Sequence, residues 1–406
     1  MIFSRRTMFW TAAAPALVGK TASYTQQEIE KKIVQRDFRG LTKQDLPTPV
    51  LVLDQEVFES NVRRMAVHCK SAGIALRAHV KVHRSADIGK RQVAAGAIGL
   101  CCATISEAEW MSANGIRGLL WTTQPVGPNK TSRAVALAKR DPSFLCAVDD
   151  ASVVDNLDEA ARAAGTRASV VVDLDVGIGR QGVLSAQEAL ELAQRITKLR
   201  NLRLAGLMGY SGAASHAIGW ETRKKISEEA VGKLLEAAGL CRKSGIEIKI
   251  VTGGSTGSYN IDSGIEGMTE LQAGSYALMD ARYRTVGGKT NSAVFDDFGC
   301  APTVLTRVIS KKHPNKAAID AGNKALTRET DVVKDWPGLE PRPAGAEYGS
   351  LVWKNADREP KLGDLAELIM TNLDMSVNMF DRMFVCRNDR VADVYSVLGR
   401  RGPAQR

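Results

Sequence analysis

The sequence lacks three features that would assign it to a specialised class of protein: paired cysteine motifs, long apolar runs and low-complexity tracts. Its seven cysteines are scattered and include no Cys-x-x-Cys pair. We therefore expect neither a zinc cage nor a disulfide framework, and we interpret the cysteines as small buried apolar residues. No uncharged apolar segment reaches the roughly 18 residues that are needed to cross a bilayer. The sequence thus predicts no membrane span.

The sequence also lacks the pattern that would give its positive charge a nucleic-acid or membrane partner. Lysine and arginine together number 55, against 45 aspartates and glutamates. Such an excess can serve a nucleic acid, a membrane surface or a small anion. No lysine- and arginine-rich cluster is interleaved with aromatic residues, and no basic amphipathic helix stands out. We expect a small-molecule partner and no nucleic acid.

What is present is the composition of an ordinary globular protein. The 406 residues are 44% hydrophobic and 25% charged, which excludes a disordered chain. A chain of this length fits two domains, or one barrel with an appendage.

The first 22 residues resemble a twin-arginine export signal. Arg5 and Arg6 precede a short alanine-rich apolar stretch, the order of segments found in such signals. The alternative is a chance pair of arginines. We predict that the folded protein is exported to the periplasm, and that it is cytoplasmic if the signal is not used. Residues 23–46 are polar and charged, and are predicted to form a linker.

Strand-length and helix-length segments alternate through the middle of the chain. An apolar segment at 48–54, with the helix that Asp54 can cap, is predicted to open the first domain. Eight further strand-length segments follow at 74–81, 97–103, 118–122, 143–148, 168–175, 202–210, 247–252 and 270–275. Eight strands that alternate with helices favour a closed parallel (β/α)₈ barrel over an open sheet.

The pattern changes after residue 284. Shorter β-like segments and a proline-rich loop follow. The sequence therefore predicts an α/β protein with a TIM-type barrel over residues 47–284 and a smaller, mainly β domain over residues 285–402.

Four basic residues stand at every second position of the first predicted barrel strand: Arg77, His79, Lys81 and His83. A strand would place all four on one face, which points into the barrel or its mouth. Crowding of positive charge favours the neutral, nucleophilic form of a lysine. We therefore identify Lys81 as a candidate nucleophile. The alternative, a solvated basic strand edge, is weakened by the apolar residues between them.

Polar and glycine-rich loops follow the last four predicted barrel strands. Arg180 lies in the first loop, and Tyr210 and His216 lie in the second. Active sites of such barrels form at this end, and phosphate is commonly bound by loops after the seventh and eighth strands. A candidate amine with two candidate phosphate loops suggests pyridoxal phosphate linked to Lys81. The loops cover residues 177–182, 210–216, 253–258 and 274–276.

At these residues the sequence resembles a family of fold-type III pyridoxal-phosphate enzymes, the D-threonine aldolases, D-3-hydroxyaspartate aldolases and D-serine dehydratases. The motifs are Arg77-x-His79-x-Lys81-x-His83, Gly177-x-Gly179-Arg180-x-Gly182, Gly253-Gly254-x-Thr256-Gly257-Ser258 and Gly274-Ser275-Tyr276-x-x-Met279-Asp280. The resemblance implies an alanine racemase-like barrel, a Schiff base on Lys81 and an arginine, Arg180, facing the pyridine nitrogen. It implies that His216 works near the substrate hydroxyl. It implies further cofactor contacts from His79, Tyr210, Ser255, Thr256, Gly257, Ser275 and Tyr276.

The resemblance also implies a divalent metal ion, manganese, magnesium or zinc, held by a His-x-Asp or His-x-Cys pair in the C-terminal domain. Asp374 stands at the acidic position, but Asn372 stands where the histidine is expected. A second departure is Tyr348, in a Glu-Tyr-Gly segment that usually reads Glu-His-Gly. An amide oxygen suits magnesium, calcium or manganese better than zinc. His313 is the remaining histidine of this domain.

The resemblance implies a lyase that cleaves D-β-hydroxy-α-amino acids to glycine and an aldehyde, and a homodimer. The weakened metal site favours this aldolase over its alternative, a dehydratase acting on D-serine or D-3-hydroxyaspartate, because expulsion of a hydroxyl gains most from a Lewis acid. A further alternative is a cofactor-binding protein with a degenerate metal site.

Overall fold

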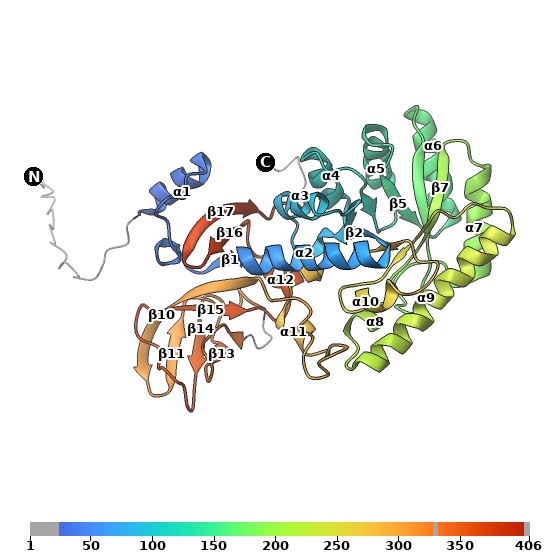
Figure 1. Cartoon of the computed structure of the whole chain (residues 1–406). Coiled ribbons are helices and arrows are strands. Elements are labelled where there is room, and N and C mark those ends of the chain that lie inside the picture. Colours follow the sequence, from blue (N-terminus) through green and yellow to red (C-terminus); the bar gives the residue numbers. More distant parts are fainter. Residues whose placement is uncertain (1–23, 328–331, 402–406) are drawn as a thin grey trace, which may run out of the picture.

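The computed structural model describes residues 24–327 and 332–401, which form a barrel and a separate β-sheet (Figure 1). The long helix α2 (Gln55–Ala72) connects the two parts, and its buried face carries Phe58, Val62 and Met65. Asp54 caps this helix by accepting a hydrogen bond from the Val57 backbone N–H, as its position in the sequence predicts.

Eight parallel strands close into the barrel, in chain order. This confirms the predicted TIM-type architecture. The strands are β2 (Ala75–His79), β3 (Gly99–Cys102), β4 (Leu120–Trp121), β5 (Leu145–Val148), β6 (Ala168–Asp173), β7 (Leu202–Gly209), β8 (Ile250–Gly253) and β9 (Glu270–Leu271). The helices between them are α3 (Ala86–Ala94), α4 (Ile105–Ala113), α5 (Pro128–Arg140), α6 (Ala151–Ala163), α7 (Ala186–Lys198), α8 (Gly212–His216), α9 (Trp220–Lys243) and α10 (Tyr259–Asp262).

The strand predicted to open the barrel domain belongs to the other part of the molecule. β1 (Val50–Asp54) pairs with β10 (Pro302–His313) antiparallel and with β16 (Arg382–Arg387) parallel. The prediction that residues 48–54 begin the barrel domain is therefore wrong. An apolar run shows that a strand is buried, but it does not show which strands lie beside it.

The second part is a nine-stranded sheet whose pairings are mostly antiparallel, and it agrees with the mainly β domain predicted for the C-terminal region. Its main path runs β13-β14-β11-β10-β1-β16-β17, with β15 pairing to β10 and β12. The remaining strands are β11 (Lys316–Ile319), β12 (Val332–Val333), β13 (Glu340–Pro343), β14 (Gly349–Val352), β15 (Leu365–Ile369) and β17 (Arg390–Ser396). Two short helices, α11 (Ala281–Arg284) and α12 (Leu373–Val377), lie where the sheet meets the barrel.

The segment predicted as a linker packs against this sheet. Helix α1 (Gln26–Gln35) buries Ile29 in a cluster with Leu41, Leu46 and Phe384. A capping box at Thr25 and Glu28 starts the helix. The predicted export signal, residues 1–22, lies outside the described residues.

Two expectations from composition concern the whole chain. Every cysteine is a free thiol, and all but the half-buried Cys300 are buried, which agrees with their interpretation as small apolar residues. Among the described residues, no helix has the length and apolar character needed to cross a membrane.

Candidate active site

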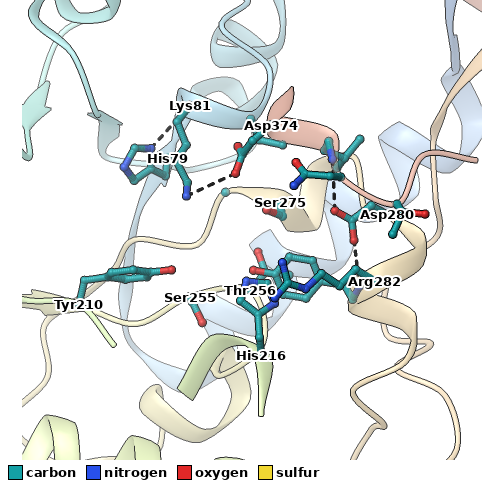
Figure 2. A pocket seen from close by; sticks show the side chains of 16 residues that line it. His79, Lys81, Tyr210, His216, Ser255, Thr256, Ser275, Asp280, Arg282 and Asp374 are labelled. Atoms are coloured by element: carbon teal, nitrogen blue, oxygen red, sulfur yellow. Dashed lines mark hydrogen bonds and ion pairs between the residues drawn. The ribbon is translucent and has the colours of Figure 1, made fainter. Parts of the chain in front are cut away.

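A cavity opens at the carboxyl ends of the barrel strands, where the sheet domain covers the barrel (Figure 2). Lys81, His216 and Thr256 line it from the barrel, and Arg282 and Asp374 line it from the segments that join the sheet. A second hollow, which shares His79, Lys81 and Tyr210 with the first, extends to Arg180. The predicted nucleophile and the predicted loops therefore meet at one place.

The basic stretch is not one continuous strand. β2 ends at His79, and residues Val80–Val82 form a 3₁₀ turn, so the four side chains do not share one strand face. Arg77 points to the opposite end of the barrel, where its guanidinium binds both carboxylate oxygens of Glu270, at 2.9 and 2.7 Å. The expectation that Arg77 and Lys81 share one strand face is therefore wrong.

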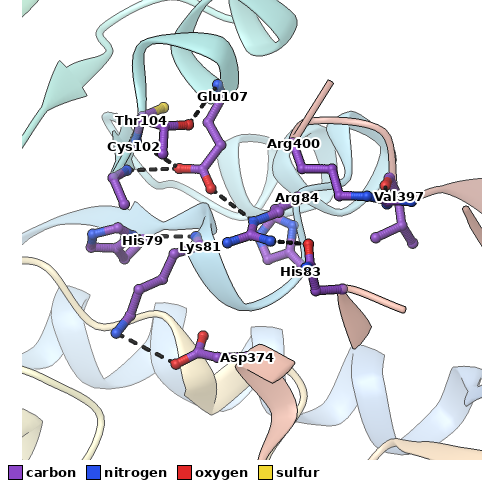
Figure 3. Close-up of polar contacts among 12 residues, drawn as sticks. His79, Lys81, His83, Arg84, Cys102, Thr104, Glu107, Asp374, Val397 and Arg400 are labelled. Carbon is purple, nitrogen blue, oxygen red and sulfur yellow. Dashed lines mark hydrogen bonds and ion pairs between the residues drawn. The ribbon is translucent and has the colours of Figure 1, made fainter. Parts of the chain in front are cut away.

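The turn that carries Lys81 is fixed by its neighbours. The Lys81 backbone N–H donates to His79 Nδ1 over 3.3 Å. Beyond the turn, Arg84 donates to the fully buried Glu107 over 2.9 Å and also binds the Asn378 side chain (Figure 3). Arg84 thus ties the lysine turn to helix α4 and to the end of α12.

The amine of Lys81 has an acidic partner in the sheet domain. Its Nζ lies 3.6 Å from Asp374 Oδ2 (Figure 3). Burial, followed by the charge of Lys81, holds the pKa of His79 well below its usual value, so this imidazole is neutral. Lys81 thus places the predicted nucleophilic amine among the residues that line the cavity.

A compact turn presents Arg180. Asp175 accepts hydrogen bonds from the backbone N–H groups of Gly177, Ile178 and Gly179, which folds the loop after β6. The Arg180 guanidinium lies 5.6 Å from the centre of the Tyr210 ring. Both therefore border the hollow that contains Lys81, as predicted.

Sequence reasoning missed two polar residues near Arg180, the buried Asp173 and the half-buried Gln181. Asp173 accepts a hydrogen bond from Gln181 over 2.7 Å, and burial raises the pKa of its carboxyl to about 7. These residues line the same hollow as Arg180. The only signal in the sequence was that Asp173 is an acidic residue at the end of an apolar strand, and an acidic residue in that position is equally typical of a helix cap.

The two glycine-rich loops meet as predicted, with one difference. Ser255, Thr256 and Ser275 line the cavity, and the Tyr276 backbone N–H donates to Thr256 Oγ1 over 2.9 Å. Gly257 has no room for a side chain, because a Cβ there would lie 1.9 Å from the Ser215 carbonyl oxygen. The Tyr276 side chain does not line the cavity; it is buried, and its hydroxyl accepts a hydrogen bond from Gln92.

His216, at the end of α8, faces the cavity beside Tyr283. Burial, followed by the charge of Arg282, lowers the pKa of its imidazole to about 4. Its Nδ1 is buried and has no hydrogen-bond partner among the described residues. At neutral pH the imidazole is therefore unprotonated, and His216 lines the cavity together with Lys81.

Helix α11 brings in residues that the sequence analysis did not single out as site residues. Asp280 caps it by accepting from the Tyr283 N–H over 2.8 Å, and its other oxygen accepts from the Leu373 N–H over 3.4 Å. The residue before it, Met279, has a φ of 58° and turns the chain toward the cavity. Arg282, on the same helix, lines the cavity.

Comparison with known proteins assigns this geometry to a family. Residues 53–281 match the model described as "Alanine racemase, N-terminal domain", and residues 301–386 match the "Putative serine dehydratase domain". The chain is 35% identical over 355 residues to the D-threonine aldolase of an Arthrobacter species, covering 87% of this chain and 92% of that protein. The chain belongs to the D-threonine aldolase and D-serine dehydratase family.

Two further comparisons agree with this membership. A 3-hydroxy-D-aspartate aldolase of Paracoccus denitrificans is 32% identical over 365 residues, covering 89% of this chain and 94% of that protein. The crystal structure of the D-threonine aldolase from Filomicrobium marinum superposes with a TM-score of 0.84 at 33% identity, covering 88% of this chain and 96% of that one. The expected family and fold are confirmed.

The residues of the cavity fit the cofactor of this family, pyridoxal phosphate. Lys81 offers the amine that would hold the cofactor's aldehyde carbon. Ser255, Thr256 and Ser275 offer hydroxyl donors for a phosphate, and Gly257 lets the backbone of this loop pack closely against the Ser215 carbonyl of α8. Arg180 would face the ring nitrogen, and a guanidinium cannot take a proton from it.

The residues at the family's metal position do not fit a divalent ion. Asn372 Oδ1 accepts a hydrogen bond from the Met375 N–H over 3.2 Å, which caps α12, and Asp374 pairs with Lys81. Tyr348 is 56% exposed and does not line the cavity, and His313 lies at the end of strand β10. Within residues 24–327 and 332–401, no group of three or more histidine, cysteine, aspartate or glutamate side chains could hold a metal.

Proposed function

We propose that this protein is a pyridoxal-phosphate-dependent lyase that cleaves the Cα–Cβ bond of D-β-hydroxy-α-amino acids. The products are glycine and an aldehyde. The observation that carries the proposal is the meeting of Lys81 with a neutral imidazole, that of His216, in one cavity. The D-threonine aldolase and 3-hydroxy-D-aspartate aldolase among its relatives support this substrate class.

When bound, pyridoxal phosphate supplies an electron sink for the pair left on Cα. The neutral imidazole of His216, which lines the cavity, accepts the proton of the β-hydroxyl. The electron pair of that O–H bond forms the carbonyl of the aldehyde, the Cα–Cβ bond breaks, and Cα then takes up a proton to give glycine. Asp374 holds the free Lys81 amine near the cavity whenever that amine carries no cofactor.

The alternative, a dehydratase, removes the α-proton and expels the β-hydroxyl as water. The match of residues 301–386 to a serine dehydratase domain supports this alternative. Departure of a hydroxyl gains from a Lewis acid, and the residues at the metal position do not provide one. The aldolase reaction is the better match, because it requires a base on the β-hydroxyl and no activation of a leaving group.

The test uses the holoenzyme with D-threonine, D-3-hydroxyaspartate and D-serine. We expect acetaldehyde or glyoxylate together with equal amounts of glycine. Ammonia with a keto acid would instead establish the dehydratase. A cofactor absorption band that disappears in Lys81→Ala, without turnover of any D-hydroxyamino acid, would identify a binding protein without this activity.

We also propose that the protein is a homodimer and that residues 1–22 direct its export by the twin-arginine route. The family resemblance supports the dimer, and the Arg5-Arg6 pair before an alanine-rich stretch supports the export. Light scattering tests the dimer. Fractionation of cells that express the full chain and its Arg5→Lys/Arg6→Lys variant tests export, and equal periplasmic amounts of the two would contradict it.

A further inference from the structure

The cavity contains a second cation that the proposed reaction does not use. Arg282 lines it together with Lys81, His216 and Asp374, and Figure 2 shows its side chain directed into the cavity. Lys81 has Asp374 as its ion-pair partner, at 3.6 Å. In the part of the chain that the structure describes, Arg282 forms no ion pair with a carboxylate.

The position of Arg282 is fixed by contacts between two distant segments. The Ala281 N–H donates to the Met370 carbonyl over 3.0 Å, and Asp280 accepts from the Leu373 N–H. On the other side, the Tyr283 hydroxyl lies 2.8 Å from the Ser215 hydroxyl. The helix that carries Arg282 is thus held between the barrel and the segment at the family's metal position.

The positive charge of Arg282 affects the ionisation of a residue that lines the cavity. Together with burial, it lowers the pKa of His216. A guanidinium stays protonated at all physiological pH values and presents up to five N–H donors in one plane. Such a group disfavours a neighbouring divalent cation and binds a carboxylate through two parallel hydrogen bonds.

We propose that the guanidinium of Arg282, rather than a divalent metal ion, supplies the positive charge that binds a substrate carboxylate in this cavity. The inference rests on the proposed function, because it names the residue that recognises the substrate of that same reaction. Two carboxylates share this chemistry: the α-carboxylate present in every amino acid, and the side-chain carboxylate of a substrate such as D-3-hydroxyaspartate.

The experiment compares the wild-type holoenzyme with Arg282→Gln and with a matched control, Arg284→Gln, which removes a cation from the same helix outside the cavity. All proteins are dialysed against a chelator and analysed for metal. We expect wild-type activity to persist. We expect KM to rise about 10- to 100-fold in Arg282→Gln and to be unchanged in the control, since hydrogen bonds to charged groups contribute about 1.5–3 kcal/mol.

The two substrates separate the two carboxylates. A rise in KM for both D-threonine and D-3-hydroxyaspartate assigns Arg282 to the α-carboxylate, and a rise for D-3-hydroxyaspartate alone assigns it to the side chain. Arg282→Lys keeps the charge but not the planar fork, and should lie between the wild type and Arg282→Gln. This variant also keeps the test informative if Arg282→Gln folds poorly.

Three results would overturn the inference. The first is an inactive chelated enzyme that manganese or zinc restores. The second is an unchanged KM in Arg282→Gln. The third is loss of the cofactor absorption band in that variant, which would assign the guanidinium to the phosphate.

Failure of the proposed function itself is recognised separately. If no D-hydroxyamino acid is turned over, the carboxylate site can still be tested by measuring the affinity of succinate for the wild-type and Arg282→Gln holoenzymes by calorimetry. Weaker binding by Arg282→Gln would support the inference, and equal binding would contradict it.

Discussion

The buried ion pair at the floor of the barrel leads to a sharp prediction about stability. Arg77 and Glu270 are each only 5% exposed, and Arg77 also donates to the Gly118 carbonyl oxygen. Glu270→Gln leaves the guanidinium buried without its counter-charge. Removing one partner of a buried pair costs about 3–5 kcal/mol. We therefore expect a decrease of about 3–5 kcal/mol in the free energy of unfolding, and a fall of roughly 4–6 °C in Tm.

The assay is thermal and chemical unfolding of the holoenzyme, followed by circular dichroism, with Glu266→Gln as the control. Glu266 is exposed in the same β8–β9 connection, so its substitution should change stability by less than about 0.5 kcal/mol. The double variant Arg77→Met/Glu270→Leu should recover most of the loss, because it leaves no buried charge unpaired.

Cofactor binding should not change in the Glu270→Gln variant. Arg77 and Glu270 lie at the barrel end opposite Lys81, so folded Glu270→Gln should bind pyridoxal phosphate as tightly as the wild type. A variant of unchanged stability that binds the cofactor poorly would refute this account, and would return Arg77 to the active site.

Further predictions concern Lys81, His216 and Gly257. Lys81→Ala should abolish both turnover and the absorption band of the bound cofactor, as measured by spectrophotometry. His216→Gln should lower kcat about 10²- to 10⁴-fold, the usual contribution of a general base, with cofactor binding retained. Because the pKa of His216 is lowered to about 4 from an ordinary 6.5, the imidazole stays neutral down to about pH 4, and its contribution to kcat/KM should persist below pH 6.5. Below pH 6.5 this histidine takes up a proton more readily in the unfolded chain than in the folded one. The free energy of unfolding should therefore decrease as the pH falls from about 6.5 to 4. Gly257→Ala should raise the cofactor dissociation constant at least tenfold, since its Cβ would meet the Ser215 carbonyl, and unchanged affinity in equilibrium dialysis would contradict the close approach.

Much of the barrel could be predicted from the sequence, because its strands are short apolar runs separated by helices of regular periodicity. Lys81, Arg180 and His216 could be found because parallel strands bring their carboxyl ends to one face. The partner of Arg77 could not be predicted, because Glu270 lies 193 residues away and follows no local pattern. Lys81 reaches the cavity from a 3₁₀ turn rather than a strand, and alternation alone does not distinguish the two.

The C-terminal side of the site was less predictable for the same reason. Arg282 acquires its place only because α11 packs against the segment before α12, about 90 residues later in the chain. Tyr276 follows a residue that lines the cavity, yet its side chain points into the core. Motif position determines where a backbone passes, whereas the direction of each side chain depends on packing with residues far along the chain.

The position of β1 between β10 and β16 means that the two parts of the molecule cannot be separated by one cut. During synthesis the barrel strands all emerge before β10 and β16, so β1 can complete its two pairings only after β16 has been made. A fragment beginning at residue 75 would contain every barrel strand, but would leave the other sheet divided along its middle. Strands from the beginning and the end of the chain thus lie in one sheet, and completing that sheet closes the cavity over Lys81.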